Sequence, residues 1–160
     1  MAAVRILQPR RPWEGRRVVL GITGGIAAYK SVQVARDLTR LGARVDVVMT
    51  GGALHFVQPL SFQAVTGREV FTDLFSGSGP AAHIQLGMKA DAVLVAPATA
   101  DFLARAASGM ADDLLTTTLL VTRAPVLLCP AMNERMFSHP QTTENLKHLQ
   151  SALGYRVAGP

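Results

Sequence analysis

The chain of 160 residues carries a formal net charge of +5 and is 49% hydrophobic but only 6% aromatic, which suits one α/β domain and excludes two full cores or a largely disordered chain. Five of its sixteen basic residues fall within positions 5–17, so the charge marks a flexible basic N-terminal arm over residues 1–15 and argues against nucleic acid as a partner. The single cysteine and the lack of a long apolar stretch exclude a disulfide framework and predict a cytoplasmic protein without a signal peptide or membrane partner.

The first half of the chain predicts a β-α-β unit. Residues 17–22 form a short, β-branched apolar run that ends in Thr23-Gly24-Gly25, which is typical of a buried strand followed by a tight turn. Apolar residues from 26 to 41 recur at helical spacing, and Gly42 ends this predicted helix. Residues 44–49 form the next predicted strand, so we expect a parallel pair with a right-handed connection.

The rest of the chain continues this alternation. We expect helical structure from residue 53 to 65, interrupted by Pro59, and a loop over 71–80. Further strands are predicted at 90–96, 126–129 and 155–157, and further helices at 99–107, 112–121 and 143–153. The predicted fold over residues 16–160 is therefore α/β, with a single doubly wound, Rossmann-like parallel sheet and helices on both faces.

Ligands of such sheets bind where loops leave the carboxyl ends of the strands. The first such loop, Thr23-Gly24-Gly25-Ile26, places backbone amides at a helix start, where a phosphate is favoured. It lacks the G-x-G-x-x-G spacing, and Thr50 after the second strand offers no carboxylate to a ribose. These features disfavour NAD and suit a mononucleotide phosphate, although a purely structural glycine turn stays open at this point.

Polar side chains that could carry chemistry follow the later strands. Thr99 and Asp101 could cap a helix or face a ligand, and Asn133 could bond a carboxylate or a planar ring. His83 could transfer a proton near neutral pH, although a lone histidine is more often structural. The histidines and acids show no metal-ligand spacing, so we expect no metal site.

Five segments in a fixed order carry a family resemblance. They are GITGGIAAYK at 21–30, HIQL at 83–86, PATAD at 97–101, GMADDL at 109–114 and PAMNERM at 130–136. Together they resemble the homo-oligomeric flavin-containing cysteine decarboxylase family, and most closely its coenzyme A biosynthesis branch, over residues 17–160. The resemblance implies FMN as the cofactor and decarboxylation of 4'-phosphopantothenoylcysteine to 4'-phosphopantetheine.

The resemblance also assigns residues. It implies that the FMN phosphate lies near Gly24, Gly25, Ile26 and Thr50, and that the flavin ring lies among Phe56, Thr99, Ala100, Asp101 and Ala131. The family's active-site histidine corresponds to His83, and its carboxylate-binding asparagine corresponds to Asn133. Many relatives have asparagine where this chain has Asp101, but similar members also have aspartate. The family assembles as trimers or larger homo-oligomers, with FMN at a subunit boundary.

One family element has no counterpart in this sequence. The proton-donating cysteine lies on a mobile substrate clamp that corresponds to positions beyond Pro160, and Cys129 does not match it. The resemblance therefore implies one of two things. The chain is a domain without this clamp that performs the oxidative half of the reaction, or it is the front part of a longer chain with a fused ligase.

Three alternatives stay open. A peptidyl-cysteine decarboxylase would need no clamp, but the motif at 109–114 favours the coenzyme A branch. A non-catalytic flavin-binding regulatory subunit is disfavoured by the presence of both His83 and Asn133. A Rossmann-like domain without flavin would be colourless.

Overall fold

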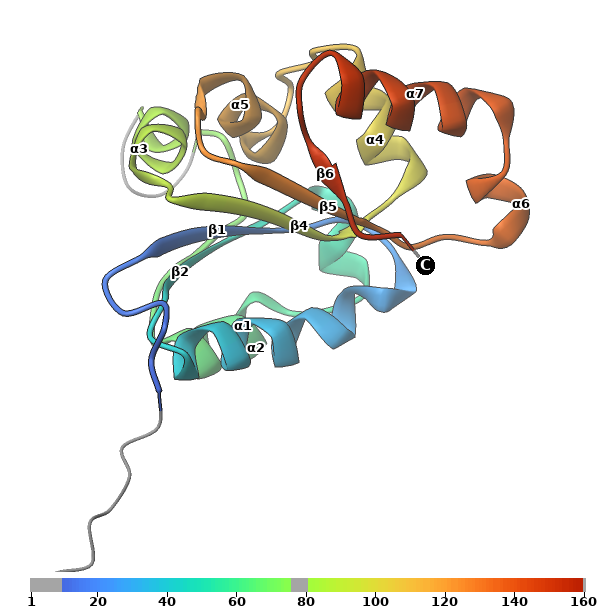
Figure 1. Cartoon of the computed structure of the whole chain (residues 1–160). Helices are drawn as coiled ribbons and strands as arrows, with labels where there is room; N and C mark the ends of the chain where they lie inside the picture. Colours follow the sequence, from blue (N-terminus) through green and yellow to red (C-terminus); the bar gives the residue numbers. More distant parts are fainter. Residues whose placement is uncertain (1–9, 76–80, 160) are drawn as a thin grey trace, which may run out of the picture.

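The computed structural model describes residues 10–75 and 81–159. Its six strands form one parallel sheet with the order β3-β2-β1-β4-β5-β6 (Figure 1). The strands are β1 (Arg17–Ile22), β2 (Arg44–Met49), β3 (Val70–Phe71), β4 (Ala92–Ala98), β5 (Val126–Pro130) and β6 (Arg156–Val157). The chain winds outward in both directions from β1 and β4, so the predicted doubly wound sheet is confirmed.

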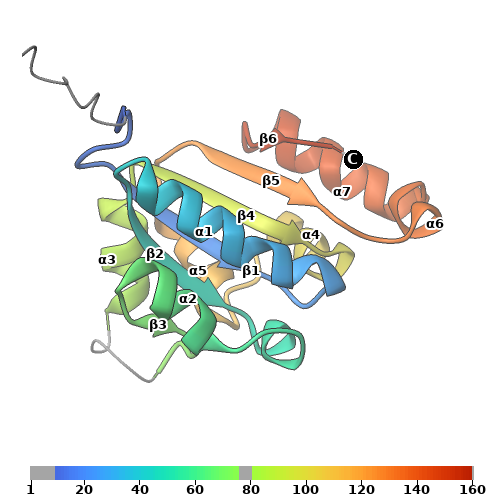
Figure 2. The same ribbon diagram turned by 90° about the horizontal axis from the view of Figure 1, so that it is seen from below.

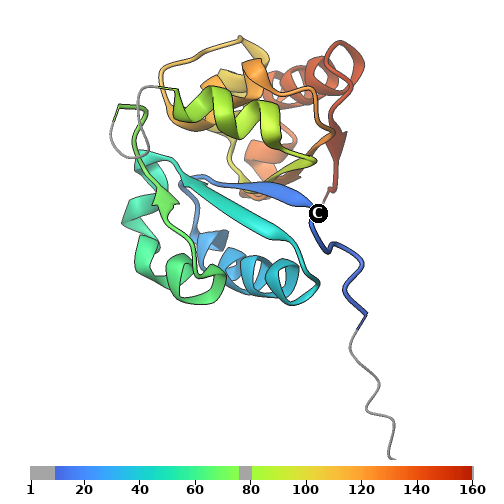
Figure 3. The ribbon, with the colours of Figure 1, turned by 90° about the vertical axis from the view of Figure 1, so that its left-hand side faces the viewer.

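Helices cover both faces of this sheet, as predicted. They are η1 (Ile26–Lys30), α1 (Ser31–Arg40), η2 (Gly51–His55), α2 (Pro59–Thr66), α3 (Ala82–Lys89), α4 (Ala100–Ala107), α5 (Leu114–Val121), α6 (Glu134–Phe137) and α7 (Pro140–Ser151). Helices α1 and α2 lie on one face, and α3, α4, α5 and α7 lie on the other (Figures 1 and 2). Figure 3 shows the sheet between these two helical layers.

Two hydrophobic clusters fill the spaces between the sheet and the helical layers. Val19 belongs to the cluster under α3, α4, α5 and α7, whereas its neighbour Leu20 belongs to the cluster under α1 and α2. Both side chains are fully buried. Successive strand residues point to opposite faces, so a strand covered on both faces needs apolar residues at every position. This burial explains the uninterrupted apolar runs that identify the strands in the sequence.

The structure corrects several predicted boundaries. The helix expected over residues 26–41 is a short 3-10 helix followed by α1, and Pro59 begins α2 at its first position instead of interrupting a helix. The sequence predicted neither β3, whose Phe71 was expected in a loop, nor α6, and it did not predict α3. Its Gly87 is unfavourable for a helix, but a Cβ at this position would stand 2.8 Å from the Cβ of Val121 on α5. Close packing between the two helices therefore requires this glycine.

Part of the expected N-terminal arm contacts the domain. The backbone amide of Trp13 donates to the carbonyl of Leu41 at 3.0 Å, and the indole packs beside the cluster under α1 and α2. Arg11 and Glu14 form an exposed ion pair of 2.9 Å. Residues 10–15 are thus held against the α1 side of the domain, and residues 1–9 lie outside the described residues. None of the described helices is long and apolar enough to cross a lipid bilayer.

Candidate functional site

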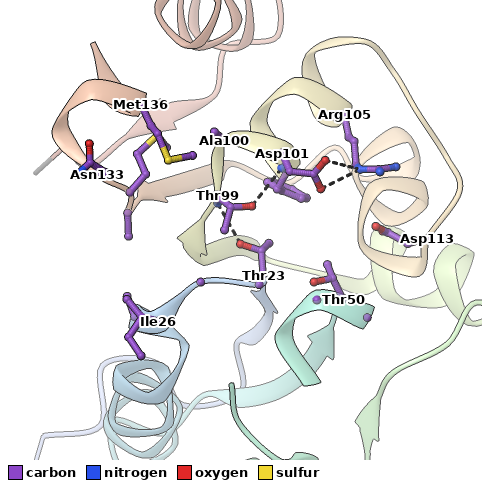
Figure 4. A pocket seen from close by; sticks show the side chains of 18 of the residues that line it. Thr23, Ile26, Thr50, Thr99, Ala100, Asp101, Arg105, Asp113, Asn133 and Met136 are labelled. Carbon is purple, nitrogen blue, oxygen red and sulfur yellow. Dashed lines mark hydrogen bonds and ion pairs between the residues drawn. The ribbon is translucent and has the colours of Figure 1, made fainter. Parts of the chain in front are cut away.

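Loops at the carboxyl ends of β1, β2, β4 and β5 surround a cavity of about 810 Å³ (Figure 4). Its volume lies within the usual range for small-molecule sites. It is placed where the strand order reverses between β1 and β4, the usual ligand position in such sheets. The predicted site residues that line it are Gly24, Gly25, Ile26, Thr50, Thr99, Ala100, Asp101, Ala131 and Asn133.

Two glycine loops form one end of the cavity. A Cβ on Gly24 would stand 2.8 Å from the carbonyl carbon of Gly52, so a side chain at Gly24 would collide with backbone. The 3-10 helices η1 and η2 begin beside this contact at Ile26 and Gly51, and no side chain caps either start. Amides at a helix start have no partner within the helix and suit an anion. This end of the cavity therefore fits a phosphate group.

The loop after β4 brings Thr99 to the middle of the cavity. Its hydroxyl accepts a hydrogen bond from the amide of Phe102 at 3.2 Å, so Thr99 is the N-cap of α4. The amide of Thr99 in turn donates to the hydroxyl of Thr23 at 3.0 Å. Thr99 and Asp101 were both candidates for the N-cap. Thr99 is the cap, and Asp101 lies in the first turn of α4, where its carboxylate does not cap the helix.

Asp101 belongs to a small charge cluster on the cavity wall. The Nε of Arg105 donates to both of its carboxylate oxygens, at 3.0 and 3.1 Å (Figure 4). The Nη1 of Arg105 reaches Asp112 at 2.5 Å. Hydrogen bonds and charge from Asp101, and then from Asp112, raise the pKa of the Arg105 guanidinium above its ordinary value. The guanidinium therefore partly neutralises the carboxylates that would otherwise repel an anionic ligand.

The loop after β5 presents Asn133 at the cavity. Its Oδ1 accepts a hydrogen bond from the amide of Arg135 at 2.9 Å, which makes Asn133 the N-cap of α6. This bond fixes the side chain and leaves its NH2 group free to donate to a ligand. Met136, half exposed, completes this wall. The arrangement can bind a carboxylate or another acceptor without bringing a formal charge.

His83 and Phe56 are the predicted site residues that the single chain does not bring to the cavity. Phe56 follows η2 and is 46% exposed. His83 is the second residue of α3 and half buried. Its Nδ1 is buried and has no hydrogen-bond partner among the described residues. The catalytic role of His83 stays a prediction.

Several lining residues were not identified as site residues from the sequence. They are Thr23, Ala27, Gly51, Gly52, Phe102, Arg105, Asp112, Asp113, Met132 and Met136. The i, i+4 spacing of Asp101 and Arg105 was the available signal for their ion pair. Asp113 caps α5, with its Oδ1 accepting from the amide of Thr116 at 2.8 Å. Its contribution to the wall is thus partly structural.

Comparison with known families and proteins agrees with this geometry. The Flavoprotein family model matches residues 6–160. Over 135 residues the chain is 51% identical to the coenzyme A biosynthesis bifunctional protein CoaBC of Mycobacterium tuberculosis. This alignment covers 84% of the chain and 32% of the length of CoaBC. The chain thus spans about a third of the length of the curated relatives that it matches.

Solved structures share the whole architecture. The FMN-dependent cysteine decarboxylase SpaF superposes with a TM-score of 0.86 and 37% identity, covering 92% of this chain and 86% of SpaF. A PPC decarboxylase mutant complexed with pantothenoylaminoethenethiol superposes with a TM-score of 0.78 and 31% identity, covering 89% of this chain and 81% of that structure.

Proposed function

The chain belongs to the Flavoprotein family, and we propose that it is the FMN-dependent decarboxylase domain that acts on 4'-phosphopantothenoylcysteine in coenzyme A biosynthesis. The observation that carries the proposal is one cavity with a glycine-lined phosphate end and the Asn133 amide at another wall. The likeness to CoaBC and to the PPC decarboxylase structure supports the substrate. The substrate therefore combines a cysteine carboxylate with a phosphopantothenoyl arm.

FMN fits the residues that line the cavity. Gly24 and Gly52 pack backbone to backbone, which leaves backbone amides accessible at the phosphate end. Gly24, Gly25, Ile26 and Thr50 would hold the phosphate there. Thr99, Ala100, Asp101 and Ala131 would hold the ring. Phe56 lies outside the cavity lining and is 46% exposed, so its contact with the ring stays a prediction. Bound FMN would supply the electron sink for oxidising the substrate cysteine, whose carboxylate can then leave as carbon dioxide.

The protein's own contribution is to bind and orient the substrate. The NH2 group of Asn133 would donate to the substrate carboxylate, since Oδ1 is held by the Arg135 amide. A neutral donor suits a substrate carboxylate that leaves as carbon dioxide. A cation would stabilise the carboxylate strongly in the ground state and so would not favour its loss. Met136 would help to exclude water from this part of the cavity.

We further propose that the active protein is a homo-oligomer, and that His83 acts in the cavity of a neighbouring copy. Beside His83, Ile84 and Met88 expose 42% and 73% of their surface, and Ile26 at the cavity exposes 76%. Exposed apolar side chains at two different places suit a head-to-tail contact between copies, which forms a ring where the rotation closes. Mixing inactive His83→Asn and Asn133→Asp chains should then restore activity, since some interfaces would combine two intact halves. Failure to do so, with mixed oligomers demonstrated, would contradict a shared site.

Measuring carbon dioxide release from 4'-phosphopantothenoylcysteine by the FMN-loaded chain tests the main proposal. A peptide ending in cysteine is the competing substrate, favoured by the likeness to the cysteine decarboxylase SpaF. Release from the first substrate and not from the second would support the proposal, and the reverse would assign a peptide substrate. Binding of FMN without release from either would favour a regulatory subunit. A fused ligase and a cytoplasmic location remain predictions.

A further inference from the structure

The end of β4 is held partly by side-chain hydrogen bonds from outside the sheet. Pairing between β1 and β4 stops at Gly21 and Val95, and the pairing of β4 with β5 shifts register between Val95 and Ala98. Three consecutive carbonyls in this stretch are bonded by other segments. Those of Ala96, Pro97 and Ala98 accept from Ser31 Oγ at 2.6 Å, Thr23 Oγ1 at 2.6 Å and the Ala131 amide at 3.2 Å.

Thr23 is the member of this set that forms two bonds to the β4 end. Its hydroxyl donates to the carbonyl of Pro97 and accepts from the amide of Thr99 at 3.0 Å. The residue is only 1% exposed, so water cannot replace either bond. One buried hydroxyl therefore joins the end of β1 to the turn that begins α4.

The two segments joined by Thr23 carry different parts of the cavity. Gly24 and Gly25 follow it directly, and Thr99 begins α4 with Asp101 in its first turn. The segments also touch, because a Cβ on Gly25 would stand 3.3 Å from the Cγ2 of Thr99. The Thr23 hydroxyl thus sets the spacing between the glycine loop and the start of α4.

We infer that Thr23 is a positioning residue, whose hydroxyl holds the start of α4 against the glycine loop at the spacing that FMN needs to contact both. The inference rests on the proposed function, since it takes FMN as the ligand. Thr23 itself acts through Thr99 and need not touch the cofactor.

The test compares three variants of the full chain. Thr23→Val keeps the shape and loses both bonds, so its FMN affinity should fall about tenfold or more. Thr23→Ser keeps the hydroxyl and should bind FMN nearly as the unchanged chain does. Thr118→Val is the matched control, because Thr118 is equally buried but bonds only to Leu114 within α5. It should lower stability to urea and leave FMN affinity unchanged.

Two readouts decide the outcome. The first readout is FMN affinity, measured by fluorescence quenching. The inference would be overturned if Thr23→Val bound FMN as tightly as the unchanged chain. It would also be overturned if Thr23→Val and Thr118→Val lost the same stability and the same FMN affinity. Hydrogen exchange of the Thr99 amide in the cofactor-free chain should be faster in Thr23→Val and normal in Thr23→Ser. If the unchanged chain did not bind FMN, the proposed function would fail, whereas unaltered Thr99 exchange in Thr23→Val would overturn the role of Thr23 independently.

Discussion

Gly24 and Gly52 pack backbone to backbone at the carboxyl edge of the sheet, where a Cβ on Gly24 would stand 2.8 Å from the carbonyl carbon of Gly52. The two residues come from loops after different strands, β1 and β2. Their contact brings the starts of η1 and η2 together and keeps side chains out of the space between the two glycine loops. The cavity therefore depends on a glycine for a packing reason rather than for an unusual backbone angle.

Replacing Gly24 with alanine should damage the phosphate end. The added methyl group must push the Gly52 loop away, so we expect weaker FMN binding by about tenfold or more and a loss of about 1–3 kcal/mol in unfolding free energy. FMN titration and urea unfolding measure these effects. Gly159→Ala is the control, since a Cβ there meets no atom within 4 Å and Gly159 does not line the cavity. Equal effects in the two variants would refute the packing argument.

Asn133→Asp should separate substrate binding from helix capping. Aspartate keeps the oxygen that accepts from the Arg135 amide, so α6 and FMN binding should be preserved. It loses the NH2 donor and brings a negative charge toward the substrate carboxylate, so kcat/KM should fall about a hundredfold or more. Steady-state kinetics with the flavin spectrum as a control check this. Normal kcat/KM would remove Asn133 from the proposed carboxylate site.

Asp46 should contribute strongly to folding. This carboxylate is 1% exposed and is held by two arginines, Arg17 at 2.5 Å and Arg68 at 2.7 Å. Asp46→Asn would leave two neighbouring guanidinium groups without their counter-charge, which should cost about 2–4 kcal/mol in urea unfolding. Glu14→Gln, at the exposed pair with Arg11, should change stability by less than about 1 kcal/mol. Similar losses in both variants would contradict the distinction between buried and exposed pairs.

Cys129 should react slowly with alkylating reagents. Burial on β5 raises the pKa of its thiol, so at a given pH the folded chain holds less thiolate than the unfolded chain. The pH at which iodoacetamide labelling reaches half its maximal rate should therefore be higher in the folded chain than in urea. Mass spectrometry measures the rate, and a lower midpoint in the folded chain would mark Cys129 as an activated thiol.

The sequence predicts the sheet well for a physical reason. Strands such as β1 and β4 lie between two helical layers and are apolar at nearly every position, so their composition identifies them. Helix α3 escaped prediction because Gly87, which disfavours a helix, is required by contact with Val121 of α5. That contact joins residues far apart in the chain, and no local pattern encodes it.

Much of the cavity lining was predicted as well. Residues directly after strands, such as Gly24, Thr99 and Asn133, could be assigned because parallel strands bring their carboxyl ends to one edge. The pairing of Arg105 with Asp112 could not be predicted, since it depends on how the turn before α5 folds back. In the proposed homo-oligomer, the position of His83 relative to a cavity would depend on packing between chains, which the sequence pattern of one chain does not specify.

The most direct test is to load the chain with FMN, add 4'-phosphopantothenoylcysteine without oxygen, and record the visible absorbance of the oxidised flavin together with released carbon dioxide. The proposed function predicts loss of this absorbance in step with carbon dioxide release, and neither change in Asn133→Asp. A chain that binds FMN but shows no change with this substrate would contradict the account.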